Sequence, residues 1–192
     1  MKLIFLDHDG VIALSNNWGG RTKKFAKYRS ANPDTSKDIK DAPVSFRFDD
    51  FDKKAIKILN KILEETGAEI VVSSDWKLYA TLEELGEYYE EQGIIKKPIA
   101  LTDNLKDCTV HGDNFMWSTM WDSEQMRTIE IKQYLHDHPE VTHWVAIDDL
   151  NMGKIGETWK DLWAIDNFVL TPKSNEGIKQ LGIKEKILNY LG

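Results

Sequence analysis

Cysteine is almost absent from this 192-residue sequence: Cys108 stands alone, so the chain cannot form an internal disulfide. Long apolar runs are also missing. The first spans only residues 3–6, too short for the core of a signal peptide, and none approaches the roughly 20 residues that cross a membrane. The Gly-x-x-x-x-Gly-Lys-Ser/Thr loop of many kinases does not occur either. These absences exclude a disulfide-stapled fold and predict a cytoplasmic protein with no membrane partner.

Positive charge is scarce overall, since 25 Lys and Arg face 32 Asp and Glu and the net charge is −7. Because phosphate backbones are held mainly by Lys and Arg, this balance argues against broad nucleic-acid binding. One acid-free segment departs from it, and its cations are Arg21, Lys23, Lys24, Lys27 and Arg29. Interleaved with Phe25 and Tyr28, they form either the solvated face of a short helix or a patch that tracks phosphates and stacks bases.

The composition is otherwise that of a folded domain. With 41% apolar residues, seven Trp and seven Phe, the chain can fill a sizeable core, and its length fits one domain over residues 1–192. The polar stretch 15–50 is too long for a simple connection and is therefore predicted to be an insertion.

Three apolar runs each end abruptly in small polar or acidic residues. Residues 3–6 lead into Asp7 and Asp9, residues 69–72 lead into Ser73-Ser74-Asp75, and residues 144–147 lead into Asp148-Asp149. Such runs are typical of strands buried on both faces of a parallel sheet, whose carboxyl ends share one edge. The pattern predicts an α/β, doubly wound fold with its site at that edge.

Helical periodicity separates these runs. The sequence predicts helices over about 52–66, from Thr81 to near Gly93, over 123–136 and over 184–191, and a short helix around 154–160. Further strands are expected at 94–101 and 162–165. Between them, Met116, Trp117, Met120 and Trp121 are expected in the core rather than in a cleft.

Asp7 and Asp9, two residues apart with Gly10 next to them, suit phosphate chemistry. They can converge on one hard cation, which brings a phosphate oxygen against one of them. Held that close, one carboxyl is pushed toward its protonated form, as a general acid requires. One aspartate can then attack while the other donates a proton.

The order of these motifs resembles that of the haloacid-dehalogenase-like (HAD) phosphohydrolases. Residues 6–11 look like the first motif, Val72-Ser73 like the second and Ile147-Asp148-Asp149 like the acidic fourth. The third motif is a single basic residue opening the helix before the fourth strand. Arg127 fits that place, with Lys132 as the alternative. The resemblance extends from Lys2 to about Thr171.

The resemblance implies a role for each motif residue. Asp7 would attack phosphorus to form an aspartyl-phosphate, and Asp9 would protonate the leaving oxygen and later activate water. Magnesium would be held by the Asp7 carboxylate, the Asp9 backbone carbonyl and Asp148, with Asp149 in or just behind the first ligand shell. Phosphoryl oxygens would be held by Ser73, with Ser74 beside it, and by Arg127. His8, where an apolar residue is usual, is expected to face away from the site.

Within the superfamily, the chain looks closest to HAD domains of nucleic-acid repair proteins and to the 3′-phosphatase domains of polynucleotide kinases. The features behind this likeness include Ser-Ser-x-Trp after the second strand and a late Val-Leu-Thr at 169–171. It implies a phosphatase for nucleic-acid 3′ ends, with residues 15–50 as a flap or cap and Lys23, Lys24 and Lys27 on the substrate. A phosphatase of a small metabolite or nucleotide, and a HAD-fold binding domain without turnover, remain alternatives.

Overall fold

A five-stranded, all-parallel sheet forms the centre of the protein in the order β3-β2-β1-β4-β5. The computed structural model describes residues 1–33, 38–104, 123–156 and 161–192. The strands are β1 (Lys2–Leu6), β2 (Glu69–Val72), β3 (Ala100–Leu101), β4 (His143–Asp148) and β5 (Phe168–Leu170). Because β1 lies in the middle and β2 and β4 flank it, the three acid-ended strands are adjacent, as predicted.

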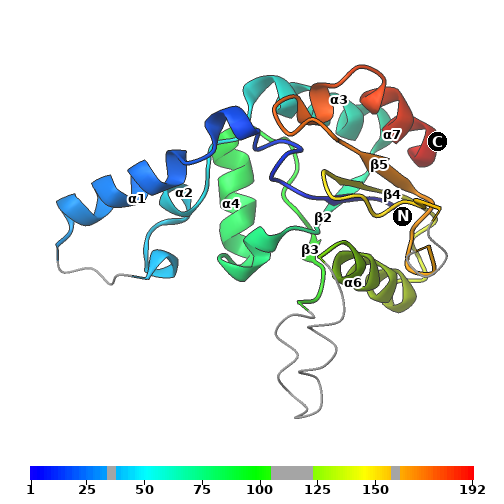
Figure 1. The fold of residues 1–192 in the computed structure, drawn as a ribbon, viewed down its shortest axis with the longest axis horizontal. Helices are drawn as coiled ribbons and strands as arrows, with labels where there is room; N and C mark the ends of the chain where they lie inside the picture. The colour runs from blue at the N-terminus through cyan, green and yellow to red at the C-terminus, as the bar shows by residue number, and fades with distance from the viewer. Residues whose placement is uncertain (34–37, 105–122, 157–160) are drawn as a thin grey trace, which may run out of the picture.

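Side chains alternate across the sheet, so each strand feeds two cores. On β1, Ile4 and Leu6 join the larger cluster, whereas Leu3 and Phe5 join the smaller one. The larger cluster is completed by α3 (Lys53–Thr66), α4 (Leu82–Gln92) and α7 (Ile183–Leu191). The smaller cluster is covered by α6 (Ser123–Asp137). Helices on both faces of a parallel sheet make this the expected doubly wound α/β fold (Figure 1).

Helices α3, α4, α6 and α7 occupy predicted segments, and the ends of α3 and α4 carry the expected caps. Asp52 accepts hydrogen bonds from two backbone amides at the start of α3, and Gly67 ends that helix in the left-handed conformation. Thr81 and Glu84 form a reciprocal capping box on α4, which Gly93 terminates.

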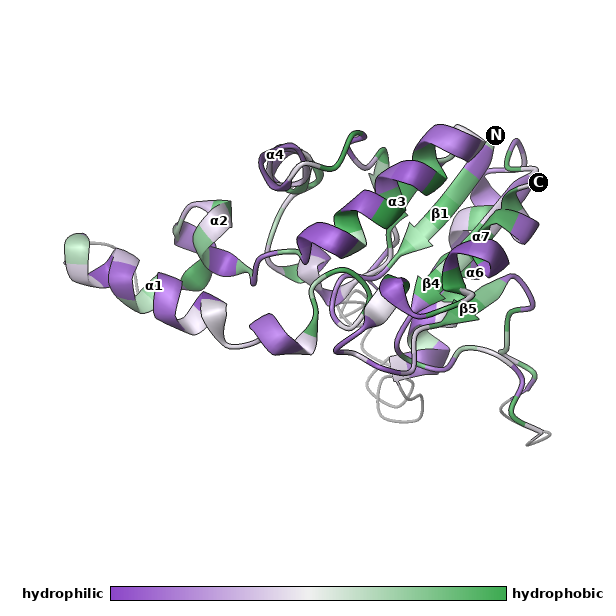
Figure 2. Cartoon of the chain, turned by 90° about the horizontal axis from the view of Figure 1, so that it is seen from above, coloured by the Kyte–Doolittle hydropathy of each residue, from purple (hydrophilic) through white to green (hydrophobic). Residues whose placement is uncertain are grey.

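The described parts of residues 15–50 lead away from the sheet and include the α-helices α1 (Gly20–Ala31) and α2 (Val44–Arg47). None of the residues of α1 is buried. Figures 1 and 2 show α1 and α2 projecting to one side of the body that contains the sheet. We call residues 15–33 and 38–50 the arm.

Three sequence predictions of local structure are not met, or are met only in part, in the described residues. Of the strand expected at 94–101, only Ala100–Leu101 pairs, because the preceding segment turns at the surface, with Ile95 and Ile99 exposed. The strand expected at 162–165 lies instead at Phe168–Leu170, where the backbone reaches β4. Residues 154–156 are not helical. The rest of that predicted helix, Cys108 and the Met116–Trp121 group lie outside the described residues.

Candidate active site

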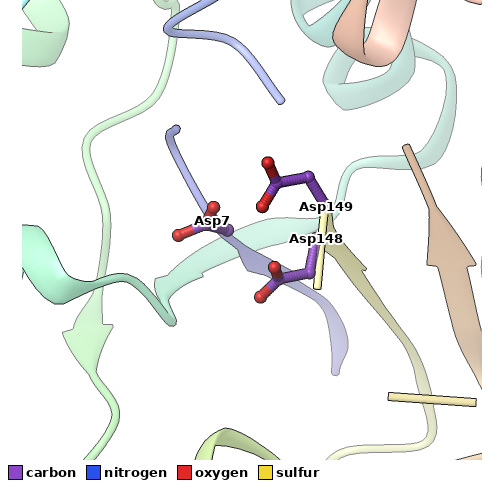
Figure 3. Close-up of side chains that lie close together, drawn as sticks. All are labelled: Asp7, Asp148 and Asp149. Atoms are coloured by element: carbon purple, nitrogen blue, oxygen red, sulfur yellow. The ribbon is translucent and has the colours of Figure 1, made fainter. Parts of the chain in front are cut away.

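Three carboxylates meet at the carboxyl edge of the sheet. Asp7 follows β1, Asp148 ends β4 and Asp149 comes next, and one oxygen of each lies within 4.8 Å of the others (Figure 3). Asp149 can approach this closely because Gly10 has no side chain: a Cβ there would overlap the Asp149 carboxylate. Gly10 also has φ +72°, a conformation that favours glycine.

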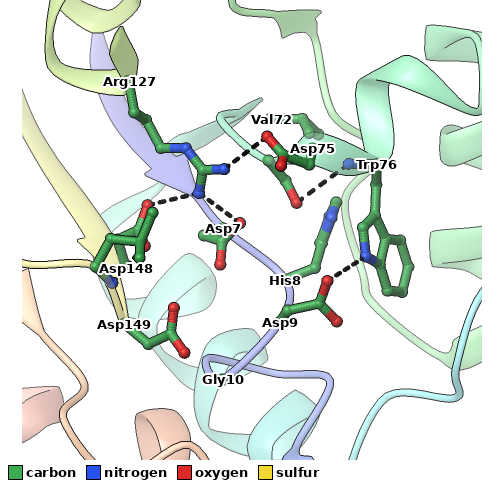
Figure 4. Close-up of polar contacts among 12 residues, drawn as sticks. Asp7, His8, Asp9, Gly10, Val72, Asp75, Trp76, Arg127, Asp148 and Asp149 are labelled. Atoms are coloured by element: carbon green, nitrogen blue, oxygen red, sulfur yellow. Dashed lines mark hydrogen bonds and ion pairs between the residues drawn. The ribbon is translucent and has the colours of Figure 1, made fainter. Parts of the chain in front are cut away.

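Arg127 joins two of these acids. Its Nη1 donates hydrogen bonds of 2.8 Å to both Asp7 Oδ1 and Asp148 Oδ2, and its Nη2 donates one of 3.1 Å to Asp75 Oδ1 (Figure 4). The residue sits in the first turns of α6, where the third-motif residue was expected. Lys132 lies elsewhere: it is exposed, and its ammonium donates to the backbone carbonyl of Trp163.

Burial weakens the acidity of this cluster. It raises the pKa of Asp7 well above its usual value, with the Asp148 charge adding to the effect and Arg127 opposing it. Burial likewise raises the pKa of Asp148 to about 6, again against the pull of Arg127. The pKa of Asp149 is also raised by burial, although a hydrogen bond from Ser174 opposes the shift. Bringing the three acids together in their charged forms therefore calls for more positive charge than Arg127 supplies.

The donor set fits a hard divalent cation. Asp7, Asp148 and Asp149 offer carboxylate oxygens only, and magnesium prefers such ligands, whereas zinc is usually held by His or Cys. A divalent cation would also offset the mutual repulsion that burial intensifies. The residues expected to bind magnesium are thus together, with Asp9 on the same loop.

Asp9 is oriented by an aromatic side chain. The indole Nε1 of Trp76 donates a 2.9 Å hydrogen bond to Asp9 Oδ2 (Figure 4). The Trp76 side chain is held in place because its ring stacks on two others. The ring centroids are 4.1 Å apart with an interplanar angle of 7° for Phe48, and 5.3 Å apart with an angle of 14° for Phe51. Burial raises the pKa of Asp9, with the Trp76 hydrogen bond and the Arg21 charge opposing it. A carboxyl held beside the other acids with a raised pKa suits a proton donor.

The two serines after β2 differ in their surroundings. A side-chain hydrogen bond from Ser74 partly offsets the raised pKa of Asp7, so Ser74 lies against the expected nucleophile. The hydroxyl of Ser73 is buried and has no hydrogen-bond partner among the described residues. Ser73 was the predicted second-motif residue, with Ser74 beside it, whereas the contact with Asp7 is made by Ser74.

His8 lies in the aromatic core beneath the site. It is fully buried, and its Nε2 forms a 2.6 Å hydrogen bond with the Tyr89 hydroxyl. Its ring packs against that of Trp76, with the ring centroids 4.4 Å apart. Burial lowers the pKa of His8 to about 3, so the ring is neutral at physiological pH.

One charged pair behind the site was missed from the sequence. Lys77 and Glu130 form a salt bridge in which both side chains are only 5% exposed. Lys77 also donates to Thr102 Oγ1 at 2.9 Å and to the Asp103 carbonyl at 2.6 Å. Glu130 stands three residues after Arg127 on α6, so this pair ties the helix that carries Arg127 to the loop after β2. The polar residues at the end of β2 were the available signal.

The cationic segment lies on α1. Lys24 serves the arm itself: its ammonium donates to the carbonyls of Ser45 and Phe48 at 3.2 and 3.1 Å and pairs with Asp50 at 2.6 Å. Lys23 and Lys27 are exposed. Of the three expected substrate-binding lysines, these two are therefore the ones whose charge faces solvent.

A family model described as a HAD domain in Swiss Army Knife RNA repair proteins matches residues 3–180. The chain belongs to this family. The match covers β1 to β5 and the acids, serines and arginine described above, which agrees with the resemblance seen in the sequence. No curated protein and no solved structure matches the chain significantly. Within the described residues, no helix of this HAD domain is long and apolar enough to span a membrane.

Proposed function

We propose that this HAD domain is a magnesium-dependent phosphomonoesterase that works through an aspartyl-phosphate and removes the 3′-phosphate from RNA ends. The observation that carries the proposal is the placement of Arg127 between Asp7 and Asp148, with Asp149 alongside. In this cluster one carboxylate can act as the nucleophile, and the charged groups around it can stabilise the negative charge of the phosphoryl group.

The reaction consists of two displacements at phosphorus. In the first, an oxygen of Asp7 bonds to phosphorus, the ester bond breaks, and Asp9 gives its proton to the leaving oxygen. In the second, Asp9 takes a proton from water, whose oxygen bonds to phosphorus as the bond to Asp7 breaks. Inorganic phosphate leaves, and both aspartates return to their starting forms. Splitting the hydrolysis this way is what a carboxylate nucleophile offers.

The surrounding residues hold the group being transferred. Ser73, Ser74 and Arg127 bind the phosphoryl oxygens, and the Arg127 guanidinium keeps its positive charge throughout. Magnesium, held by Asp7, Asp148, Asp149 and the Asp9 backbone carbonyl, would neutralise charge on the phosphoryl oxygens. Trp76 keeps the Asp9 carboxyl in place through its indole N–H.

Two observations support an RNA end as substrate. The family description names RNA repair proteins. In addition, the exposed Lys23 and Lys27 on α1 suit a phosphate backbone that extends from the site. A small metabolite makes no use of cations along a projecting helix.

Phosphate release from a panel of substrates tests the proposal. The panel holds 3′- and 5′-phosphorylated RNA oligonucleotides, matched DNA, nucleotides, sugar phosphates and an aryl phosphate, each with magnesium or with a chelator. We expect magnesium-dependent release with the highest kcat/KM on 3′-phosphorylated RNA. Preference for a nucleotide or sugar phosphate would favour a metabolite phosphatase. No release from any compound would favour a binding domain without turnover.

Added salt and a double variant test the role of α1. Lys23→Ala/Lys27→Ala should lower kcat/KM on the oligonucleotide relative to the aryl phosphate, and salt should have the same effect. Lys24 is left unchanged because it holds the arm together. Lys57→Ala/Lys61→Ala on α3 removes the same charge from exposed positions outside the arm and serves as the control. Equal effects of the two double variants would argue against a backbone-tracking helix.

A further inference from the structure

The arm is fastened to the body at several points. Arg47 pairs with both oxygens of Glu84 on α4, at 2.8 and 2.7 Å, and donates to the Ala42 and Tyr79 carbonyls. A second contact with α4 is made by the Tyr88 hydroxyl, which donates to the Asp49 carbonyl at 3.1 Å. Within the arm, the Asp49 carboxylate accepts hydrogen bonds from the Gly19 and Arg21 amides at the start of α1. These contacts make the arm a fixed platform.

Where the arm leaves the body, just before α1, Trp18 presents a large aromatic surface. Its side chain is 48% exposed, whereas Trp76 is 2% exposed. Yet the ring is held, because Nε1 donates a 3.1 Å hydrogen bond to the Ala13 carbonyl. An exposed apolar ring fixed in this way is suited to stacking against a planar group.

The same carbonyl ties Trp18 to the active-site loop. Ala13 O also accepts a 3.0 Å hydrogen bond from the Gly10 amide, next to Asp9. Two donors on one acceptor must lie near each other, so the indole nitrogen is close to the turn that carries Asp9 and approaches Asp149.

Arg21 adds a cation at the same place. It is exposed, and its charge acts on the Asp9 carboxyl. It follows Trp18 by three residues, at the first turn of α1. A planar ring and a guanidinium thus both lie near the turn that carries Asp9, before the lysines of α1.

We propose that Trp18 and Arg21 form a clamp for the terminal nucleotide of the substrate, with the Trp18 ring stacked on its base and Arg21 on its 5′-side phosphodiester. This inference rests on the proposed RNA 3′-end phosphatase and narrows its substrate. An unpaired terminal base can turn freely onto the ring, whereas a paired base is held by its partner, so we expect the clamp to favour single-stranded 3′ ends. Lys23 and Lys27 then bind phosphates further along the same RNA strand.

Removing only the terminal base tests the stacking contact separately from the phosphate contacts. Two 3′-phosphorylated RNA oligonucleotides are compared, one complete and one whose terminal nucleotide is abasic, with wild type, Trp18→Ala and Trp18→Phe. For wild type, loss of the base should raise KM about 5- to 100-fold with little change in kcat. Trp18→Ala should raise KM on the complete substrate by a similar factor and no longer distinguish the two, while Trp18→Phe recovers part of the discrimination.

Arg21 and strand pairing provide two more comparisons. Arg21→Ala should raise KM on the oligonucleotide more than Lys23→Ala, which removes one charge two residues on, about 200° around the helix. A blunt duplex with the same 3′-phosphate should be a poorer substrate than the single strand for wild type, but not for Trp18→Ala.

The outcomes separate this inference from the function beneath it. If wild type hydrolyses the 3′-phosphorylated oligonucleotide but treats complete and abasic ends alike, or if Trp18→Ala keeps the discrimination, the clamp is overturned and the phosphatase stands. If aryl phosphate is hydrolysed but no oligonucleotide end is, both the RNA substrate and the clamp are overturned. Lys57→Ala, with an exposed charge on α3, should behave as wild type throughout.

Discussion

Arg127 and Asp7, 120 residues apart in the sequence, are joined by a buried 2.8 Å hydrogen bond between Nη1 and Oδ1. The contact sets a permanent positive charge against the expected nucleophile. It opposes the effect of burial on the pKa of Asp7, which is raised nonetheless, so a bound cation would supply the further positive charge that the ionised nucleophile requires.

Arg127→Ala should lower kcat for aryl phosphate hydrolysis by about 10²- to 10³-fold, because it removes donors that stabilise charge in the transition state. Lys132→Ala should stay within a few-fold of wild type, since its exposed ammonium donates to the Trp163 carbonyl. Steady-state kinetics of the two variants and of Arg127→Lys decide the assignment. A larger loss in Lys132→Ala would transfer the third-motif role to that residue.

Ser74→Ala should impair aryl phosphate hydrolysis more than Ser73→Ala, because Ser74 is the serine that hydrogen-bonds to Asp7. The expected loss is about tenfold or more in kcat/KM, the scale of one hydrogen bond to a charged group. Circular dichroism and thermal melts of both variants check that each remains folded. If Ser73→Ala is the more damaged enzyme, the buried Ser73 hydroxyl is the one that meets the phosphoryl group.

Lys77→Met should destabilise the protein by about 3–5 kcal/mol, because it leaves the Glu130 carboxylate buried without its cation. Glu130→Leu should be similarly costly. The double variant Lys77→Met/Glu130→Leu should be more stable than either single variant, since no unpaired charge remains. Urea unfolding of the four proteins measures this difference, and additive losses in the double variant would contradict a coupled pair.

Glu84→Gln should cost about 1 kcal/mol at pH 7, and this cost should shrink as the pH is lowered toward 3. The hydrogen bond from Arg47 holds the pKa of Glu84 below its usual value, so its stabilisation is present above the pKa of the unfolded chain and lost as pH falls through the folded pKa. Unfolding free energies across that range test the sign. Glu87→Gln, an exposed change on the same helix, is the control. A gap that persists unchanged at pH 3 would contradict the ion-pair explanation.

The sequence predicted the position of the site because short apolar strands ending in acids leave few alternatives. Asp7, Asp148 and Asp149 follow from the shared edge of parallel strands alone. Arg127 needed the motif order as well, since nothing local distinguishes it from Lys132. The strand at Phe168–Leu170 was missed because three residues carry little pattern, while the apolar run at 162–165 looked more like a strand.

Contacts across the fold were beyond local pattern. The Trp76–Asp9 and Lys77–Glu130 pairs join residues 67 and 53 positions apart, so only the assembled sheet and helices bring them together. In the sequence, nothing distinguishes Lys24 from its neighbours Lys23 and Lys27. Its position facing α2 commits it to the arm's own carbonyls, which periodicity does not reveal.

In the proposed mechanism, Asp7 attacks phosphorus at a magnesium site built on Asp148 and Asp149. Aryl phosphate hydrolysis by wild type, Asp7→Asn and Asp9→Asn, each with magnesium and with a chelator, tests this mechanism most directly. We expect magnesium-dependent turnover by wild type and none by Asp7→Asn. We also expect a loss of about 10²-fold or more in Asp9→Asn, which should still be stabilised by magnesium in a thermal melt. Turnover by Asp7→Asn at the wild-type rate would contradict this mechanism.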